Sequence, residues 1–299
     1  MTKVVTYLSA QTPITASALK RLELVVNLDT TTDSISGEHS IQGELPLLQV
    51  KRLRKSFGSR LALDDVSFEL YPGEVLAIVG ESGSGKSTLL NCINANIDFD
   101  HGQVMYQSHF NGAVDMGQIS EAQQRLIKKT EWGFVHQNPR DGLIMNVSAG
   151  ANIGERLMSL GARHYGQIRA KALECLQEVE IDTARLDDLP LSFSGGMQQR
   201  LQIARNLVTQ PRLLLMDEPT SGLDVSVQAK LLDLLKQLAQ RRGLAVVIVT
   251  HDLAVARLLA NQMMVMQDGR CIEAGLTDQL LDDPQHLYSQ LLVSSILQS

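Results

Sequence analysis

Residues 80–87, GESGSGKS, are the part of the sequence that most restricts the fold. They follow the apolar run Val75–Val79 and precede Thr88. A glycine-rich turn between a buried strand and a helix start predicts a phosphate-binding loop, because the glycines let successive N–H groups converge and the helix N-terminus favours negative charge. The predicted loop residues are Gly80, Gly83, Ser84, Gly85, Lys86, Ser87 and Thr88.

Two side chains of this loop have defined tasks in the hypothesis. The Lys86 ammonium would reach the outer phosphates of a nucleoside triphosphate, and the Ser87 hydroxyl would take one coordination position on Mg²⁺. The alternative is a flexible serine–glycine turn. The preceding strand, the glycine spacing and the Lys–Ser pair together favour the phosphate-binding loop.

Composition sets limits on the class of protein. The chain has 299 residues, of which 44% are apolar, so it can bury a core as one large or two small domains. Its net charge of -6 argues against a general polyanion-binding surface and hence against direct nucleic-acid binding. The basic strip 51–55 (KRLRK) could still bind anions locally, or it could be a solvated strand face.

Three cysteines without metal-site spacing favour a reduced, cytoplasmic protein. No apolar run approaches the 18 or so residues that a membrane-spanning helix needs, so no transmembrane segment is expected.

The chain changes character at about residue 47. Residues 1–46 are polar and turn-rich, which predicts a weakly ordered N-terminal extension with a possible short helix at 16–28. Antiparallel strands are expected from Leu47 onward. Phe57 would lie at the edge of this sheet, where it could stack on an adenine ring or simply be a core residue.

Residues 139–207 have helical periodicity and predict a helical subdomain inserted into the nucleotide-binding sheet. Near its end, Ser194, Gly195 and Gly196 form a small-residue corner before a helix. Free amides at such a corner suit an anion, although an ordinary helix start with Ser194 as its N-cap explains the same residues.

Two further buried strands end in polar residues. The strand at 213–216 leads into Asp217 and Glu218, and the strand at 245–249 is followed by His251. Ligands bind at the carboxyl ends of parallel strands, so Asp217 could hold Mg²⁺ through water and Glu218 could polarise an attacking water. A carboxylate pair after a strand can also be only a turn, and a lone histidine there is usually structural.

In this order, the motifs resemble the full set of the ATP-binding cassette (ABC) ATPase family from about residue 47 to the end. The resemblance implies an α/β fold with a mixed nucleotide-binding sheet, an antiparallel β subdomain and an inserted α-helical subdomain. It also implies that Gln137, in WGFVHQ at 132–137, links the metal and the water to the helical subdomain. By the same resemblance, His251 is the switch histidine and Phe57 the adenine-stacking aromatic.

The corner at Ser194–Gly196 resembles the family signature, which completes the ATP site of the opposite subunit. The sequence departs from the commonest form at Phe193 and Met197, where Leu and Gln are usual. The resemblance implies an ATPase that sandwiches ATP between two subunits arranged head to tail, the second being a copy of itself or a related cassette protein. Hydrolysis would then separate the subunits.

Four stretches resemble more narrowly the ATPase subunits of the bacterial carbon–phosphorus lyase system, which act in phosphonate breakdown: 131–143 (EWGFVHQNPRDGL), 147–157 (VSAGANIGERL), 161–166 (GARHYG) and 292–296 (LVSSI). This resemblance implies docking on the soluble lyase core complex. No cysteine triplet for an iron–sulfur cluster is present, so the chain would supply only ATP-driven rearrangement.

Two other functions stay open at this point. The tail at 282–288 (DDPQHLY) resembles the ATPase subunits of oligopeptide, nickel or phosphonate importers. A cassette protein that acts on nucleic acid is a third class, which the acidic balance disfavours.

Overall fold

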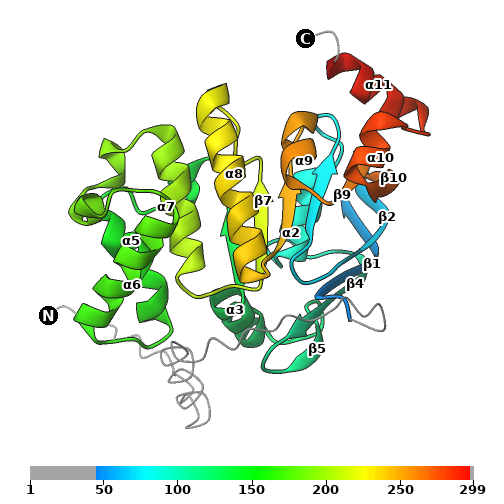
Figure 1. Ribbon diagram of the computed structural model, residues 1–299. Coiled ribbons are helices and arrows are strands. Elements are labelled where there is room, and N and C mark those ends of the chain that lie inside the picture. Colours follow the sequence, from blue (N-terminus) through cyan, green and yellow to red (C-terminus); the bar gives the residue numbers. More distant parts are fainter. Residues whose placement is uncertain (1–44, 297–299) are drawn as a thin grey trace, which may run out of the picture. The chain divides into compact units, whose positions relative to one another are not determined.

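The computed structural model describes residues 45–296. The expected N-terminal extension, with its possible helix at 16–28, lies outside these residues except for its last two positions. The described chain contains a four-stranded and a six-stranded sheet, with helices around them (Figure 1). Within this part of the chain, none of the helices is both long and apolar enough to cross a bilayer.

The four-stranded sheet is antiparallel and has the order β2-β1-β4-β5. Its strands are β1 (Leu48–Phe57), β2 (Arg60–Leu70), β4 (His101–Ser108) and β5 (Gly112–Asp115). Strands β1 and β2 pair from Leu48 opposite Leu70 to Phe57 opposite Arg60. The antiparallel strands expected near the nucleotide motif are therefore present, and both are longer than the sequence pattern indicated.

The six-stranded sheet has the order β10-β9-β3-β8-β7-β6 and carries the predicted buried strands at its centre. Its strands are β3 (Val75–Val79), β6 (Trp132–Val135), β7 (Leu213–Asp217), β8 (Ala245–Val249), β9 (Gln262–Gln267) and β10 (Arg270–Leu276). All neighbouring pairs are parallel except β9 and β10, so the sheet is mixed. Parallel strands covered on both faces are continuously apolar, as β3 and β8 are.

Alternate residues of the central strands enter two different cores. Leu76 and Ile78 of β3 pack in a cluster with α2 (Lys86–Ile93), α3 (Glu121–Thr130) and the four-stranded sheet. Ala77 and Val79 face the other way, into a cluster with helices α5 to α10. This alternation follows from the period of two residues in a strand.

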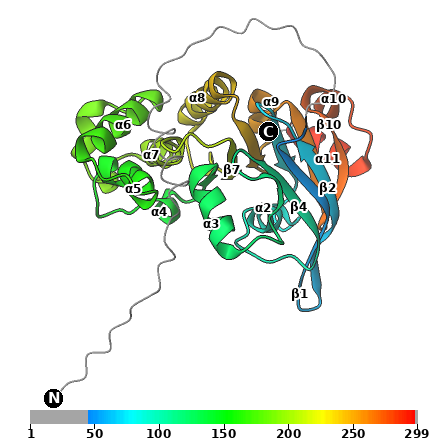
Figure 2. The same ribbon diagram turned by 90° about the horizontal axis from the view of Figure 1, so that it is seen from below.

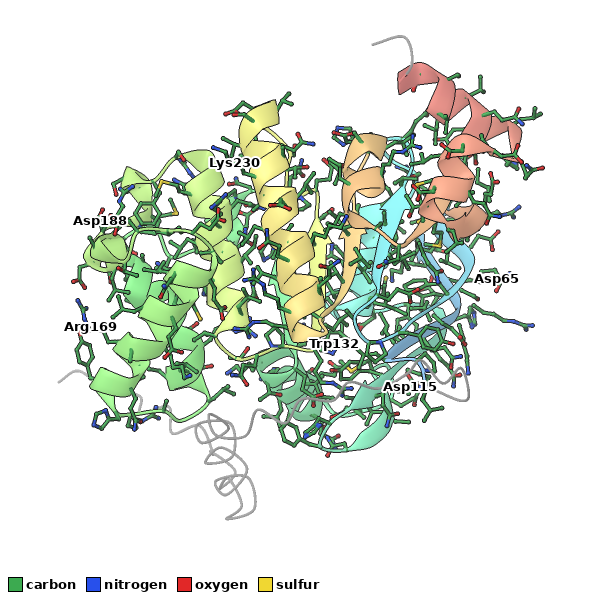
Figure 3. All side chains as sticks on the ribbon, viewed as in Figure 1. Asp65, Asp115, Trp132, Arg169, Asp188 and Lys230 are labelled. Atoms are coloured by element: carbon green, nitrogen blue, oxygen red, sulfur yellow. The ribbon has the colours of Figure 1, made fainter. Side chains whose placement is uncertain are left out.

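Helices occupy the whole interval between β6 and β7 apart from short turns. They are α4 (Pro139–Gly142), α5 (Ala149–Ser159), α6 (Tyr165–Glu178) and α7 (Gly195–Leu207), with 3-10 turns at Thr183–Asp187 and Pro190–Ser192. Both ribbon views place them together on the β6 side of the six-stranded sheet (Figures 1 and 2). Figure 3 shows Arg169 and Asp188 on this helical side and Asp65 and Asp115 at the opposite end. The fold class expected from the sequence is confirmed.

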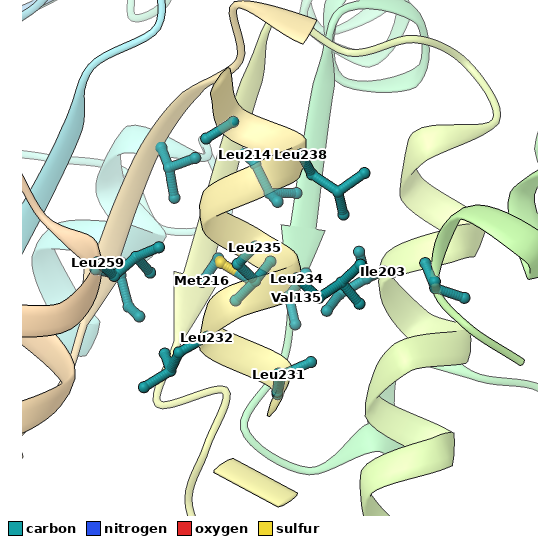
Figure 4. Close-up of a cluster of buried hydrophobic side chains, with 14 of the residues drawn as sticks. Val135, Ile203, Leu214, Met216, Leu231, Leu232, Leu234, Leu235, Leu238 and Leu259 are labelled. Carbon is teal, nitrogen blue, oxygen red and sulfur yellow. The ribbon is translucent and has the colours of Figure 1, made fainter. Parts of the chain in front are cut away.

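Helix α8 (Val225–Arg242) covers β7 with an apolar face (Figure 4). Leu231, Leu235 and Leu238 of this helix are buried against Leu214 and Met216. The Asp224 side chain accepts a hydrogen bond from Val227 N–H at the helix start, and Gly243 ends the helix in the left-handed conformation.

The last helices of the described residues are α9 (Leu253–Leu259), α10 (Thr277–Asp282) and α11 (Leu287–Ile296). The Asp252 carboxylate accepts a hydrogen bond from Ala254 N–H and is the N-cap of α9.

Candidate active site

The phosphate loop connects β3 to α2, as its sequence requires. Gly80 has a φ of 146° and Gly85 a φ of 103°, values that favour glycine. A Cβ atom on Gly80 would collide with the carbonyl oxygen of Met266, and one on Gly85 would lie 2.5 Å from the Ala62 oxygen. The glycines therefore let the loop pack tightly against neighbouring backbone.

Lys86 lies folded back into this loop. Its Nζ donates hydrogen bonds of 2.8 Å to the carbonyl oxygens of Gly80 and Glu81, and its side chain is buried. Burial lowers the pKa of the Lys86 ammonium, while the nearby carboxylates of Glu218 and Asp217 oppose that shift. The lysine is thus held inside the loop by carbonyl groups, as a cation that negatively charged ligands can attract.

At the carboxyl end of β7, Asp217 contacts the phosphate loop and Glu218 follows directly. Ser87 Oγ donates a hydrogen bond of 3.0 Å to Asp217 Oδ1. Burial raises the pKa of Asp217 above its ordinary value, and the Ser87 hydrogen bond opposes this shift. A half-buried carboxylate beside a hydroxyl is a set of oxygen donors that suits Mg²⁺.

The Glu218 carboxylate contacts both of the other predicted catalytic residues, Gln137 and His251. Gln137 Nε2 lies 3.2 Å from Glu218 Oε2 and 3.2 Å from Ser221 Oγ, and His251 Nδ1 lies 3.1 Å from Glu218 Oε1. Glu218 has a φ of 42°, which is uncommon for a residue with a side chain. Such strain is found at functional sites, so the conformation supports a role for this carboxylate.

Much of the predicted set lines one cavity of about 520 Å³. Phe57 lies at its rim with 49% of its surface exposed, so the interpretation of Phe57 as a core residue is wrong. The cavity also contains residues that sequence reasoning did not single out, namely Arg60, Leu61, Ala62, Ser82, Asp268 and Gly269. The Asp268-Gly269 pair is a typical hairpin signal between β9 and β10 and could have been noticed.

The cavity lining is Phe57, Arg60, Leu61, Ala62, Ser82, Gly83, Gly85, Lys86, Ser87, Thr88, Glu218, Asp268 and Gly269. The Ser194–Gly196 corner is not part of it. Ser194 Oγ instead accepts a hydrogen bond from Met197 N–H and caps α7. Gly195 and Gly196 lie beside Leu223 and Val227, near the start of α8. Figure 1 shows α7 and α2 on opposite sides of α8.

Side-chain amides of α7, which sequence reasoning also missed, bond the backbone immediately before Gln137. Gln202 Oε1 accepts a hydrogen bond from His136 N–H at 2.5 Å, and both Gln199 and Gln202 donate to the His136 carbonyl oxygen at 3.2 Å. One turn further, the Asn206 side chain bonds both the N–H and the C=O of Phe134. These amides, which we call the amide ladder, cover the outer edge of β6 immediately before Gln137.

A larger hollow of about 760 Å³ lies away from these motifs, on the four-stranded sheet. It is lined by Lys51, Arg52 and Arg54 of the basic strip together with Asp65 and His101. The Arg54 guanidinium lies 3.4 Å from the Asp64 carboxylate. We place the active site in the smaller cavity, because that is where the phosphate loop and the carboxylates converge.

Known proteins resemble this chain over most of its described length. The ABC transporter family profile matches residues 63–221. Over 254 residues, 85% of this chain and 99% of the relative, the sequence is 60% identical to a protein named as the phosphonates utilization ATP-binding protein PhnK of Escherichia coli (strain K12). It is 39% identical to the dipeptide transport ATP-binding protein DppF of the same strain, over 84% of this chain and 76% of that relative.

Solved structures give the same result. The dimeric ATP-binding cassette MJ0796, in a post-hydrolysis state bound to ADP and Pi, is 32% identical with a TM-score of 0.69, covering 77% of this chain and 98% of that one. The cassette cbiO1 of Clostridium perfringens is 26% identical with a TM-score of 0.71, covering 80% and 91%. The chain therefore belongs to the ABC family, as a PhnK-like ATPase that binds and hydrolyses ATP.

Proposed function

We propose that this chain is the ATPase subunit of a cytoplasmic carbon–phosphorus lyase complex in phosphonate catabolism. The observation that carries the proposal is the 60% identity to PhnK over nearly its full length, against 39% to DppF. The four stretches that resemble lyase-system ATPases support it. Three of them lie in or beside the helices between β6 and β7, where a cassette can meet its partner.

The ATP site of this proposal uses the residues around the cavity. Phe57 would stack on the adenine ring, and the loop from Gly80 to Thr88 would surround the phosphates. Ser87 and Asp217 have the donor chemistry to hold Mg²⁺ directly or through water, with Gln137 as a further oxygen donor. The metal, when bound, would neutralise negative charge on the outer phosphates.

Glu218 would accept a proton from the attacking water. Its carboxylate already contacts Gln137 and His251, which fix its orientation. His251 would hold the outer phosphate and the water in line with Glu218. A positioned carboxylate base contributes about 10²–10⁴-fold to a hydrolysis rate.

The site would be completed by a second subunit. Ser194, Gly195 and Gly196 lie outside the nucleotide cavity of their own chain, at the N-terminal end of α7. Ser194 and Gly195 are exposed there, and free amides at a helix start can bind an anion. In the proposal, this corner closes on the ATP of the opposite subunit, and hydrolysis reopens the pair. The resulting movement would rearrange the lyase core.

Affinity capture tests the complex. The tagged full chain is expressed in cells grown on a phosphonate as phosphorus source, captured, and its bound proteins identified. Soluble lyase subunits are the expected result. A membrane permease without lyase subunits would instead support the alternative, an ATPase subunit of an oligopeptide, nickel or phosphonate importer, which the match to DppF favours.

A further inference from the structure

The phosphate loop contacts a residue from the far end of the described chain. Glu81 N–H donates a hydrogen bond of 3.0 Å to the hydroxyl oxygen of Tyr288. Tyr288 lies on α11, is only 9% exposed, and belongs to the same apolar cluster as Val79 at the end of β3. The contact joins two segments that are 207 residues apart in the sequence.

Glu81 is held from its other side by Lys86. The carbonyl oxygen of Glu81 accepts a hydrogen bond of 2.8 Å from Lys86 Nζ. Tyr288 therefore fixes the N–H of the residue whose C=O binds the lysine. The placement of Glu81 sets the position of one of the two carbonyl groups that Lys86 bonds at 2.8 Å, the other being that of Gly80.

The support behind Tyr288 is itself anchored to the sheet. The Glu273 carboxylate on β10 accepts hydrogen bonds from Gln285 N–H at 2.8 Å and from His286 N–H at 3.1 Å, just before α11 begins. Beyond Tyr288, Leu292 and Val293 pack against the apolar cluster. Tyr288 is thus presented to the loop by a fixed segment.

We propose that Tyr288 is a positioning residue for the phosphate loop, and that the segment Thr277–Ile296 thereby tunes nucleotide affinity. Tyr288 does not line the nucleotide cavity, so it acts through Glu81. The family profile ends at residue 221 and does not include this segment. A loop held in one conformation binds its ligand without first being ordered, and a loop that samples others loses affinity in proportion.

The test is Tyr288→Phe in the full chain, which removes one hydroxyl and leaves the ring in its apolar cluster. The dissociation constants of Mg-ATP and Mg-ADP are expected to rise together by about 2- to 10-fold, the range that one neutral hydrogen bond supports. The turnover rate at saturating ATP should stay within about twofold of the parent. Amide exchange in the peptide that contains Glu81 should become faster.

The matched control is Tyr71→Phe, which removes another tyrosine hydroxyl, one that donates to Glu69 at 2.9 Å on the four-stranded sheet. Its affinities should equal those of the parent. The proposal is overturned if Tyr288→Phe leaves affinity and Glu81 exchange unchanged, or if Tyr71→Phe weakens binding equally. The measurement needs only nucleotide and the isolated chain, so it stands whether or not the lyase assignment holds.

Discussion

Two helices of this molecule begin at glycine-rich corners, α2 at the phosphate loop and α7 at Ser194–Gly196. The two corners differ in how far their own chain supplies contacts to them. The corner before α2 has Gly85 at the N-cap position with no side-chain cap, and Lys86 lies buried inside it. At the corner before α7, Ser194 and Gly195 are exposed and Gly196 is buried, and the Ser194 hydroxyl caps its own helix. The corner before α2 is organised within its own chain by the hydrogen bonds of Lys86, whereas the corner before α7 leaves two of its three residues open to solvent beside the start of α8. This difference is what a site shared between two subunits requires.

The largest expected effect tests the part of the ATP site that one chain supplies by itself. Glu218→Gln keeps the size of the side chain and removes its ability to accept a proton. We expect the hydrolysis rate to fall by about 10²–10⁴-fold while Mg-ATP binding is retained. Phosphate release and nucleotide binding measured on the same preparation separate the two quantities.

The control is Glu121→Gln, which changes an exposed carboxylate that forms a surface pair with Arg125. Its hydrolysis rate should match the parent. Near-normal turnover in Glu218→Gln would remove Glu218 from the mechanism.

The next effect tests the corner before α7, which we propose to serve the opposite subunit. Ser194→Arg places a long charged side chain at the exposed corner. Nucleotide binding by the single chain should be unchanged, because Ser194 does not line the cavity. ATP-dependent dimerisation of the Glu218→Gln background, measured by sedimentation, should be lost.

Loss of the helix cap alone has to be separated from loss of the shared contact. Ser120→Arg removes the cap of α3, where Ser120 Oγ accepts a hydrogen bond from Gln123 N–H. Each substitution should cost about 0.5–2 kcal/mol of stability, but only Ser194→Arg should abolish dimerisation. If Ser194→Arg still dimerised with ATP, the two corners would not differ as proposed.

The sequence predicts the phosphate loop and the strands beside it better than it predicts the residues that support them, for a physical reason. The phosphate loop and the strands Val75–Val79 and Ala245–Val249 depend on local patterns, since glycine spacing and continuous apolar runs act over a few residues. The amide ladder and Tyr288 depend on partners brought together by the fold. Asn206 meets a strand 72 residues earlier, and a polar residue on a helix gives no local sign of such a partner.

The outer strands of the six-stranded sheet show the same limit. Strands β9 and β10 were not predicted, although the Asp268-Gly269 turn lies between them. Strands β4 and β5 were also missed. In β4 the buried positions are Val104, Tyr106 and Ser108, with Met105 half-buried between them, so residue type does not follow burial; β5 has four residues and none of them is buried. The cavity therefore contains Asp268, whose turn signal was not used, and Arg60, which no motif indicated.

The smallest expected effect tests the hydrogen bonds between α7, the helix that begins at Ser194–Gly196, and strand β6. The Asn206 side chain accepts hydrogen bonds from Phe134 N–H at 3.1 Å and from Arg156 at 2.7 Å, and it donates to Phe134 C=O at 3.0 Å, all with Asn206 buried. Asn206→Leu keeps the branched shape and the number of side-chain heavy atoms, and it leaves these groups without that partner. A buried polar group left unsatisfied costs about 1–3 kcal/mol, so the free energy of unfolding should fall by about that amount.

Urea unfolding followed by the emission of Trp132, the only tryptophan, reports this loss directly, because Trp132 lies on β6 two residues before Phe134. Gln240→Leu, on the exposed face of α8, is the control and should change stability by less than about 0.5 kcal/mol. A loss confined to stability would mean that the ladder only seals the edge of β6. If the hydrolysis rate falls as well at unchanged ATP affinity, the ladder also positions Gln137 against Glu218. In that case α7, which begins at Ser194, acts through β6 and Gln137 on the catalytic carboxylate of its own chain.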